Sequence, residues 1–115
     1  MPKIVDDIKV EKTQLWLPKE QRESPLMGYQ VIQLLETNNL VRRCVRAPEL
    51  KDIQTEGPDF FLEHFFGKMV FGLGIYPESS PFLAINQSGK LEFGWHWSGY
   101  RRGVNQPVLL KPHFI

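Results

Sequence analysis

The sequence predicts one small α+β domain over residues 1–115: a mainly antiparallel sheet of about five to six strands, with two helices packed on one face. A length of 115 residues fits one domain, and 42% hydrophobic with 23% charged residues is a globular composition. Nine glycines and nine prolines divide the chain into short segments, which argues against a helical bundle. The clearest connection is a β-hairpin, and hairpins favour antiparallel pairing.

The N-terminal region predicts two short strands at the margin of the sheet. A weak strand spans 3–10, and a second strand spans 13–17 and is stopped by Pro18. The segment 19–23 is charged, and we expect it to be a loop.

A helix is predicted over 24–38. Ser24 supplies a capping hydroxyl, and Pro25 suits the first helical position because its missing N–H would have no partner there. Asn38 and Asn39 tolerate left-handed backbone and suit the end of the helix. The apolar residues that recur at helical spacing are Met27, Val31, Leu34 and Leu35.

A third marginal strand, a loop and a second helix follow. The alternation of apolar and basic residues over 41–45 favours a strand. The segment 47–57 is polar and contains Pro48, so we expect a loop. A short helix is predicted over 58–66, and Gly67 ends it. Its broad apolar face comprises Phe61, Leu62, Phe65 and Phe66.

The most apolar run of the chain, 69–76, predicts a buried strand. Gly72 and Gly74 leave one face of this strand nearly smooth. Two glycines in a strand usually mean that something packs closely against the backbone. We expect that neighbour to be a helix of this domain or another chain.

The segments 82–86 and 90–97 predict a hairpin. A three-residue loop, 87–89, keeps the apolar residues on one face and places Gly89 at the left-handed position that such a loop requires. The register then pairs Ile85 with Leu91 and Leu83 with Phe93. The residues that share this face of the second strand are Leu91, Phe93, Trp95 and Trp97, and His96 points away.

The C-terminal region predicts a loop and a final strand. The segment 98–106 is rich in glycine and basic residues, and we expect a loop. A strand over 108–111 lies between Pro107 and Pro112, which makes it short or places it at an edge of the sheet.

The composition excludes several classes of function. Fourteen Lys and Arg residues balance thirteen Asp and Glu, so bulk charge does not hold the protein to nucleic acid or to a membrane. A single cysteine excludes a disulfide framework and fits a reducing compartment, so we expect a cytoplasmic protein. No apolar run approaches the roughly 20 residues that span a bilayer, and two acids near the N-terminus argue against a signal peptide.

Catalysis and metal binding find little support. A thiol enzyme would combine Cys44 with His64, His96 or His113, but Cys44 lies in a predicted strand without a nucleophile signature. The histidines lack the spacing that places two metal ligands on one helix face, and the glycines form no phosphate-binding or dinucleotide-binding motif. We expect no catalytic residue, metal or cofactor, and keep a Cys44-dependent enzyme as the second alternative.

The end of the hairpin carries the candidate partner-binding residues Trp97, Tyr100, Arg101 and Arg102. Trp, Tyr and Arg are enriched at the energetic centres of protein interfaces. The sequence therefore favours a small non-catalytic module that binds a protein partner, such as an inhibitor, an immunity-type protein or an accessory subunit. Self-association into a homo-oligomer stays open.

Nucleic-acid binding is the first alternative. Basic residues interleaved with aromatic rings are typical of surfaces on which single-stranded bases stack. The basic residues that would carry this function form two clusters: Arg42, Arg43 and Arg46 after the first helix, and Arg101 and Arg102 beside the hairpin aromatics. The competing interpretation is that Trp95 and Trp97 belong to the core, as the hairpin register predicts.

Overall fold

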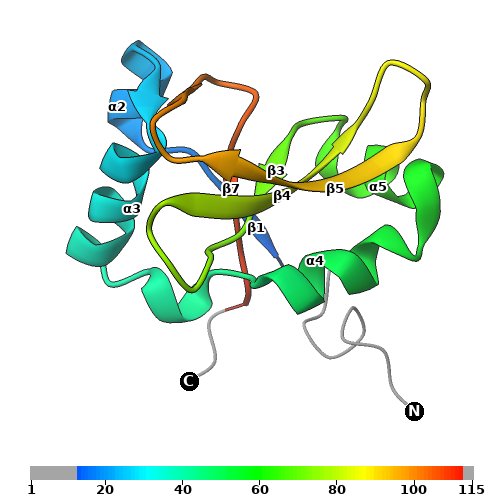
Figure 1. The fold of residues 1–115 in the computed structure, drawn as a ribbon, viewed down its shortest axis with the longest axis horizontal. Coiled ribbons are helices and arrows are strands. Elements are labelled where there is room, and N and C mark those ends of the chain that lie inside the picture. Colours follow the sequence, from blue (N-terminus) through cyan, green and yellow to red (C-terminus); the bar gives the residue numbers. More distant parts are fainter. Residues whose placement is uncertain (1–12, 113–115) are drawn as a thin grey trace.

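The chain folds around a five-stranded sheet with helices on both sides (Figure 1). The structure is a computed structural model that describes residues 13–112, so the strand predicted over 3–10 lies outside it. The helices are α2 (Lys19–Glu23), α3 (Gly28–Thr37), α4 (Ala47–Gln54) and α5 (Gly57–Phe65), with a 3₁₀ helix at Val41–Arg43. The strands are β1 (Gln14–Trp16), β2 (Leu26–Met27), β3 (Val70–Phe71), β4 (Ser79–Ile85), β5 (Leu91–Trp97), β6 (Arg101–Arg102) and β7 (Val108–Leu110).

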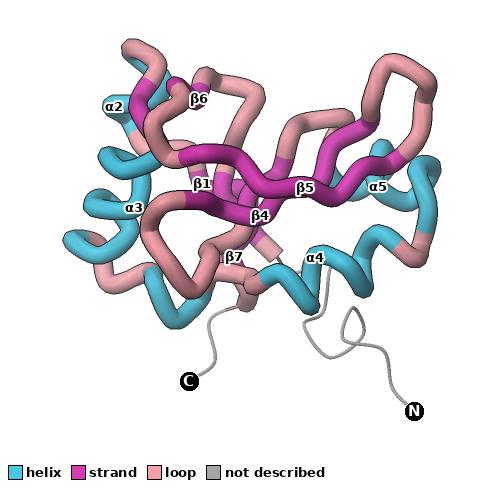
Figure 2. Tube along the Cα trace, viewed as in Figure 1, coloured by secondary structure: helices cyan, strands magenta, loops and turns pink. Residues whose placement is uncertain are grey.

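The main sheet has the strand order β1-β7-β3-β4-β5 (Figure 2). Neighbouring strands are antiparallel except β3 and β7, which run parallel. A second, two-stranded sheet joins β2 to β6. The predicted small α+β domain with a mainly antiparallel sheet is confirmed. Within the described range, no helix combines the length and the apolar character needed to cross a bilayer.

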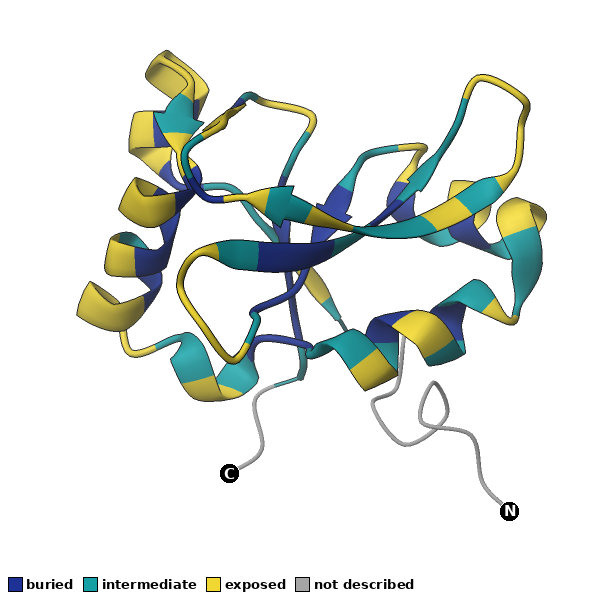
Figure 3. Cartoon of the chain, viewed as in Figure 1, coloured by how far each residue is buried: buried dark blue, intermediate teal, exposed yellow. Residues whose placement is uncertain are grey.

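Helices cover both faces of the sheet because its central strands carry apolar side chains on both sides. Figure 3 shows that these strands include buried residues. Val70 of β3 packs with α4 and α5, whereas the next residue, Phe71, packs with α3 on the opposite face. Two helices thus share a face, but they are α4 and α5. The expectation that the helices over 24–38 and 58–66 lie on one face is wrong, because a helix's apolar stripe does not say which side of a sheet it covers.

The predicted hairpin is confirmed in its loop and its register. Ile85 pairs with Leu91, and Leu83 pairs with Phe93. Gly89 has a φ of 79°, the left-handed backbone that the three-residue loop requires.

The last strand is present but lies inside the sheet. β7 has three residues, so the expected shortness is confirmed. It pairs with β1 on one side and with β3 on the other, so the expected place at the margin of the sheet is wrong. The flanking prolines do not prevent this, because they lie outside the paired residues. The carbonyl of Pro107 even accepts a hydrogen bond from the Phe71 N–H at 2.9 Å.

The segment 19–23, expected as a loop, is helix α2. Its five residues are too few to show a helical period. Gln21 is buried, and its Nε2 donates to the carbonyl oxygens of Gly103 at 2.8 Å and Gln106 at 3.1 Å. These bonds to a distant loop hold α2 against the domain.

The long helix begins at Gly28 rather than at Ser24. The residues before it, Leu26 and Met27, form β2 and pair with Arg102 and Arg101 of β6. This pairing with a segment far along the chain overrides the local capping signal. The helix ends at Thr37, close to the predicted end.

The strand expected over 41–45 is wrong, because this segment forms a 3₁₀ helix and then a single bridge from Cys44 to Leu110. Cys44 and Val45 are both buried, so the alternation of residue types does not correspond to two faces of a strand.

The loop expected over 47–57 contains helix α4. Pro48 lies in its first turn, where proline is tolerated. Glu49 Oε1 accepts a hydrogen bond from the Arg46 N–H at 2.9 Å, which caps the helix start. The proline that suggested a loop therefore belongs to a helix start.

The strand expected over 69–76 is shortened to β3. A Cβ atom on Gly72 would lie 2.6 Å from the carbonyl oxygen of Val45. The Leu73 N–H donates to the same oxygen at 2.9 Å. The predicted close approach is confirmed at Gly72. Its nearest neighbour is the backbone just before α4, and the Leu50 side chain of α4 is next at 3.1 Å.

Candidate functional site

Five large apolar side chains are exposed together near the C-terminal end of β5. We call them the aromatic surface: Ile75, Tyr76, Trp95, Trp97 and Tyr100. Their exposed fractions run from 54% for Trp95 to 89% for Ile75. Trp95, Ile75 and Tyr76 border a recess of 260 Å³, and Trp97 packs edge-on against Tyr100 with 5.4 Å between ring centroids. Trp95 and Trp97 join the two groups because alternate residues of a strand share a face.

The two tryptophans are exposed because the helices cover only the first part of β5. Leu91 and Phe93 pack against the core beneath α4 and α5. Lys51 of α4 places its Nζ 4.9 Å from the centroid of the Phe93 ring. Trp95 and Trp97 continue the same face beyond these contacts. The interpretation of both tryptophans as core residues is therefore wrong.

Backbone hydrogen bonds hold the turn after β5 against the start of α3. The Gly28 N–H donates to the Tyr100 carbonyl, and the Tyr29 N–H donates to the Ser98 carbonyl, each at 3.1 Å. Arg101 is exposed, and its Nη1 lies 3.4 Å from the carbonyl oxygen of Pro25. The exposed rings are thus presented by a fixed backbone.

Arg102 is buried, unlike the other three candidate partner-binding residues. It is 1% exposed, and its guanidinium carbon lies 3.9 Å from the centroid of the Phe71 ring. Its Nε and Nη2 atoms have no hydrogen-bond partner among residues 13–112. Burial lowers the pKa of Arg102 to about 10. The side chain therefore belongs to the core beside Phe71, on the α3 side of the sheet, and does not present its charge to solvent.

Two further buried polar atoms lie near Arg102, one on the half-buried His96 and one on Ser80. His96 packs edge-on against Phe71 and Tyr100, with 5.2 Å between ring centroids in each case. Its Nδ1 and the Oγ of the paired Ser80 have no hydrogen-bond partner within the described range. Burial, and to a smaller extent the charge of Arg102, lowers the pKa of His96.

The structure does not bring the two arginine clusters together. Arg101 and Arg102 pair with the residues just before α3, whereas Arg42 and Arg43 follow its end. The ten residues of α3 separate them by about 15 Å. Arg46 Nη1 donates to the Gly74 carbonyl at 3.1 Å, so its guanidinium is hydrogen-bonded to the protein's own backbone.

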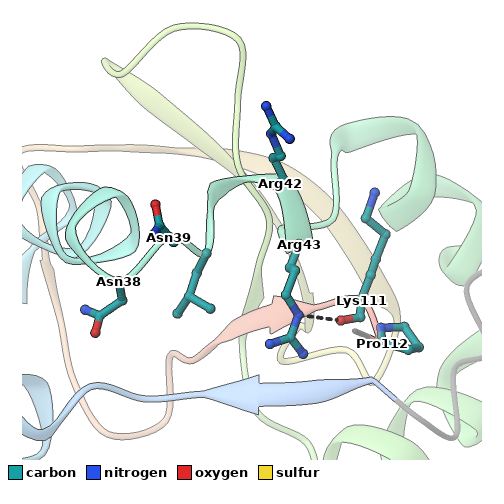
Figure 4. A pocket seen from close by; sticks show the side chains of 7 residues that line it. Asn38, Asn39, Arg42, Arg43, Lys111 and Pro112 are labelled. Carbon is teal, nitrogen blue, oxygen red and sulfur yellow. Dashed lines mark hydrogen bonds between the residues drawn. The ribbon is translucent and has the colours of Figure 1, made fainter. Parts of the chain in front are cut away.

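A recess of 630 Å³ lies beside the first arginine cluster (Figure 4). Arg42, Arg43 and Lys111 contribute to its lining, and Figure 4 shows Arg42 and Arg43 pointing in opposite directions. Arg43 donates to Gln14 Oε1 at 2.6 Å and to the Lys111 carbonyl at 3.2 Å. Lys111 Nζ lies 3.6 Å from Glu49 Oε2. Two of the three cations therefore already bond to the protein's own groups, which leaves Arg42 as the cation of this lining with no such bond shown among the described residues.

Cys44 lacks the properties of a catalytic thiol. It is 1% exposed, and its Sγ donates to the Leu40 carbonyl at 3.4 Å. Burial raises the pKa of the thiol to about 11, although Arg46, Lys111 and Arg43 oppose this shift. The reactive thiolate is therefore scarce at neutral pH.

The remaining candidate metal ligands are His64 and His113. His64 lies on α5 and its Nδ1 is 3.0 Å from the Phe60 carbonyl oxygen. His113 lies outside the described residues. The part of the chain that the structure describes holds no group of three or more potential metal ligands.

Ile75 and Tyr76 belong to the aromatic surface but were assigned to a buried strand by the sequence pattern. They lie in the connection between β3 and β4, 89% and 72% exposed. The glycine just before them and Pro77 just after them are the signals that could have indicated a loop. The Ser98 N–H donates to the Glu78 carbonyl at 2.8 Å, which ties this connection to the end of β5.

Comparison with known proteins gave no match: no family model, no curated protein and no solved structure resembles this chain.

Proposed function

We propose that this protein is a non-catalytic binding module that contacts a protein partner through the aromatic surface and the adjoining Arg101. The observation that carries the proposal is the exposure of five large apolar side chains side by side. Single exposed apolar residues are ordinary, but a contiguous group of them is typical of an interaction site.

The residue types support a protein partner. Trp, Tyr and Arg concentrate binding energy at protein interfaces, and Trp97, Tyr100 and Arg101 supply all three within one turn. The backbone of this turn is hydrogen-bonded to the start of α3, so binding a partner would immobilise few additional backbone groups. A preorganised surface of this kind loses less entropy on association. The partner would offer an apolar pocket with a carboxylate near Arg101.

The test is an affinity capture with two double variants of the full chain. Trp97→Ala with Tyr100→Ala removes rings from the aromatic surface. Leu62→Ala with Phe66→Ala is the matched control, because these side chains on or next to α5 are 49% and 74% exposed but lie outside that surface. Proteins retained by the wild type and the control, but lost by the first variant, would then be purified and measured by calorimetry.

The expected result is a loss of at least about 2 kcal/mol of binding free energy for the first variant, since central Trp and Tyr residues contribute that much. The control should bind like the wild type. Equal binding by all three proteins would contradict the proposal.

Exposure of the tryptophans also favours a second candidate function, the binding of a single nucleic-acid strand. Trp95, Trp97 and Tyr100 are free to stack on bases, and Arg101 lies beside them. Arg43 and Arg46 already donate hydrogen bonds within the protein, which leaves this function with fewer free guanidinium donors for phosphate groups than the sequence suggested. Capture that depends on nucleic acid and falls steeply with salt would favour it.

A further inference from the structure

β5 is an edge strand whose outer side is partly open. It ends the strand order of the main sheet and pairs with β4 alone among the described strands. Two bonds mark the ends of this ladder, from the Asn86 N–H to the Lys90 carbonyl and from the Ser98 N–H to the Glu78 carbonyl, each at 2.8 Å. Even-numbered residues of β5 therefore direct their peptide groups toward β4. The odd-numbered residues direct theirs outward, because successive residues face opposite edges.

Both ends of this outer edge are occupied by the protein's own groups. Gln54 Nε2 donates to the Leu91 carbonyl at 3.1 Å. The Tyr100 N–H donates to the Trp97 carbonyl at 3.1 Å. Between them, the outward peptide groups of Phe93 and Trp95 form no hydrogen bond with any residue in 13–112.

The open stretch lacks the usual protection of an edge strand. Natural edges are blocked by lysine, proline, bulges or a covering segment. The seven residues of β5 contain no proline or lysine, and their one formal charge at neutral pH is Glu92. The side chains next to the open groups include the exposed Trp95.

We propose that β5 pairs antiparallel with β5 of a second copy of this chain, with Gly94 of the two copies facing each other on a two-fold axis. This inference rests on the open backbone edge of β5 and shares only Trp95 with the aromatic surface. It extends the five-stranded sheet across the axis into one of ten strands.

The pattern of occupied groups selects this register. In a two-fold pairing, outward residues must face outward residues, so the axis passes through Phe93, Gly94 or Trp95. An axis at Phe93 would use the Leu91 carbonyl, which Gln54 occupies. An axis at Trp95 would use the Trp97 carbonyl, which Tyr100 occupies. The axis at Gly94 uses only the open groups and pairs Phe93 with Trp95 of the second copy through four hydrogen bonds.

The side chains in this register are complementary. Glu92 faces His96 of the second copy, which sets an acid beside an imidazole. Phe93 faces Trp95 of the second copy, which brings that indole to the side of the ring over which Lys51 Nζ lies in this chain, at 4.9 Å from the ring centroid. The Gly94 position brings no side chain to the axis.

The test measures self-association of the purified full chain by sedimentation equilibrium, from about 1 µM to about 1 mM, the range in which a small contact dissociates. Trp95→Lys places a new charge near Lys51 of the second copy and should weaken the dimer by about tenfold or more. Phe66→Lys is the matched control, because Phe66 is 74% exposed after α5, and it should leave the dimer unchanged.

Hydrogen exchange supplies a second readout that needs no variant. The amide protons of Phe93 and Trp95 should exchange about tenfold more slowly at the highest concentration than at the lowest, because pairing protects them. A monomer at every concentration would overturn the proposal, and so would a dimer in which these two amides stay unprotected or Trp95→Lys has no effect. Failure of the dimer proposal would not decide the capture experiment, because capture detects a foreign protein whereas sedimentation detects a second copy of this chain.

Discussion

The guanidinium of Arg102 lies 3.9 Å from the centroid of the Phe71 ring and faces no carboxylate among residues 13–112. The residue is 1% exposed, and burial lowers its pKa to about 10. Burying an unpaired ion costs several kcal/mol, whereas a desolvated cation–π contact contributes about 2 kcal/mol. The charge of Arg102 is therefore a net cost to folding, while its long stem fills core volume.

Arg102→Met should raise the free energy of unfolding by about 1 kcal/mol or more, because it keeps the volume and removes the buried charge. Arg102→Ala should lower it by about 2–4 kcal/mol, because it leaves a cavity. Urea denaturation of both variants measures the two effects. Equal destabilisation by both changes would show that the charge itself supports the fold.

His96 should make the fold sensitive to acid. Its pKa is lowered by burial and by Arg102, so the unfolded chain, with a pKa near 6.5, binds a proton more readily than the folded state. This contribution to stability is present above about pH 6.5 and is lost as the pH falls toward the folded pKa. His96→Phe should lose less stability than the wild type between about pH 7.5 and about pH 5.

The charge of Arg102 is the second cause of the lowered pKa of His96, so changing Arg102 tests the predicted acid sensitivity independently. Arg102→Met removes the charge that lowers the pKa of His96, so it should also reduce the acid sensitivity, by less than His96→Phe does. Urea midpoints at the two pH values compare the three proteins. If all three proteins lost the same stability between the two pH values, His96 would not be the cause of the acid sensitivity.

The thiol of Cys44 should be unreactive in the folded protein. Its pKa of about 11 keeps it protonated at neutral pH, and it is 1% exposed. A chromogenic disulfide reagent should react with it only at the rate at which the chain unfolds, and fully in denaturant. Fast reaction of the native protein would revive the thiol-enzyme alternative.

The raised pKa of the Cys44 thiol also predicts that the fold loses stability at alkaline pH. A thiol whose pKa is about 11 when folded and 9.0 when unfolded stabilises the fold fully below pH 9.0 and loses this contribution as the pH rises to about 11. Cys44→Ala should flatten this part of the stability profile. An unchanged slope in the variant would assign the alkaline loss to other groups.

Gly72→Ala should destabilise the protein by about 1–3 kcal/mol, the usual cost of overpacking a rigid site. The added Cβ would lie 2.6 Å from the Val45 carbonyl oxygen, a backbone atom that also accepts the Leu73 N–H. Gly103→Ala is the control, because the nearest atom to its added Cβ would be 3.9 Å away. Thermal melts should show a clear shift for the first variant and almost none for the second.

The candidate site was predictable in part. The residue types of Trp97, Tyr100 and Arg101 pointed to a binding surface, and their side chains are exposed. Arg102 is adjacent to Arg101 in sequence, yet the β2–β6 pairing turns its side chain into the core. Ile75 and Tyr76 entered the surface only because their connection is tied to the end of β5.

The sequence by itself determined the hairpin, its three-residue loop, the helix over 58–66 to within a residue and the close approach at Gly72. The hairpin and the helix depend on residues near each other in the chain, and the close approach depends on the lack of a side chain at Gly72, although its neighbour Val45 is distant in sequence. The tertiary structure decided where α3 starts, that β7 lies inside the sheet, and that the end of β5 is left uncovered. Each of these depends on which distant segment occupies the neighbouring space, and no local pattern contains that information.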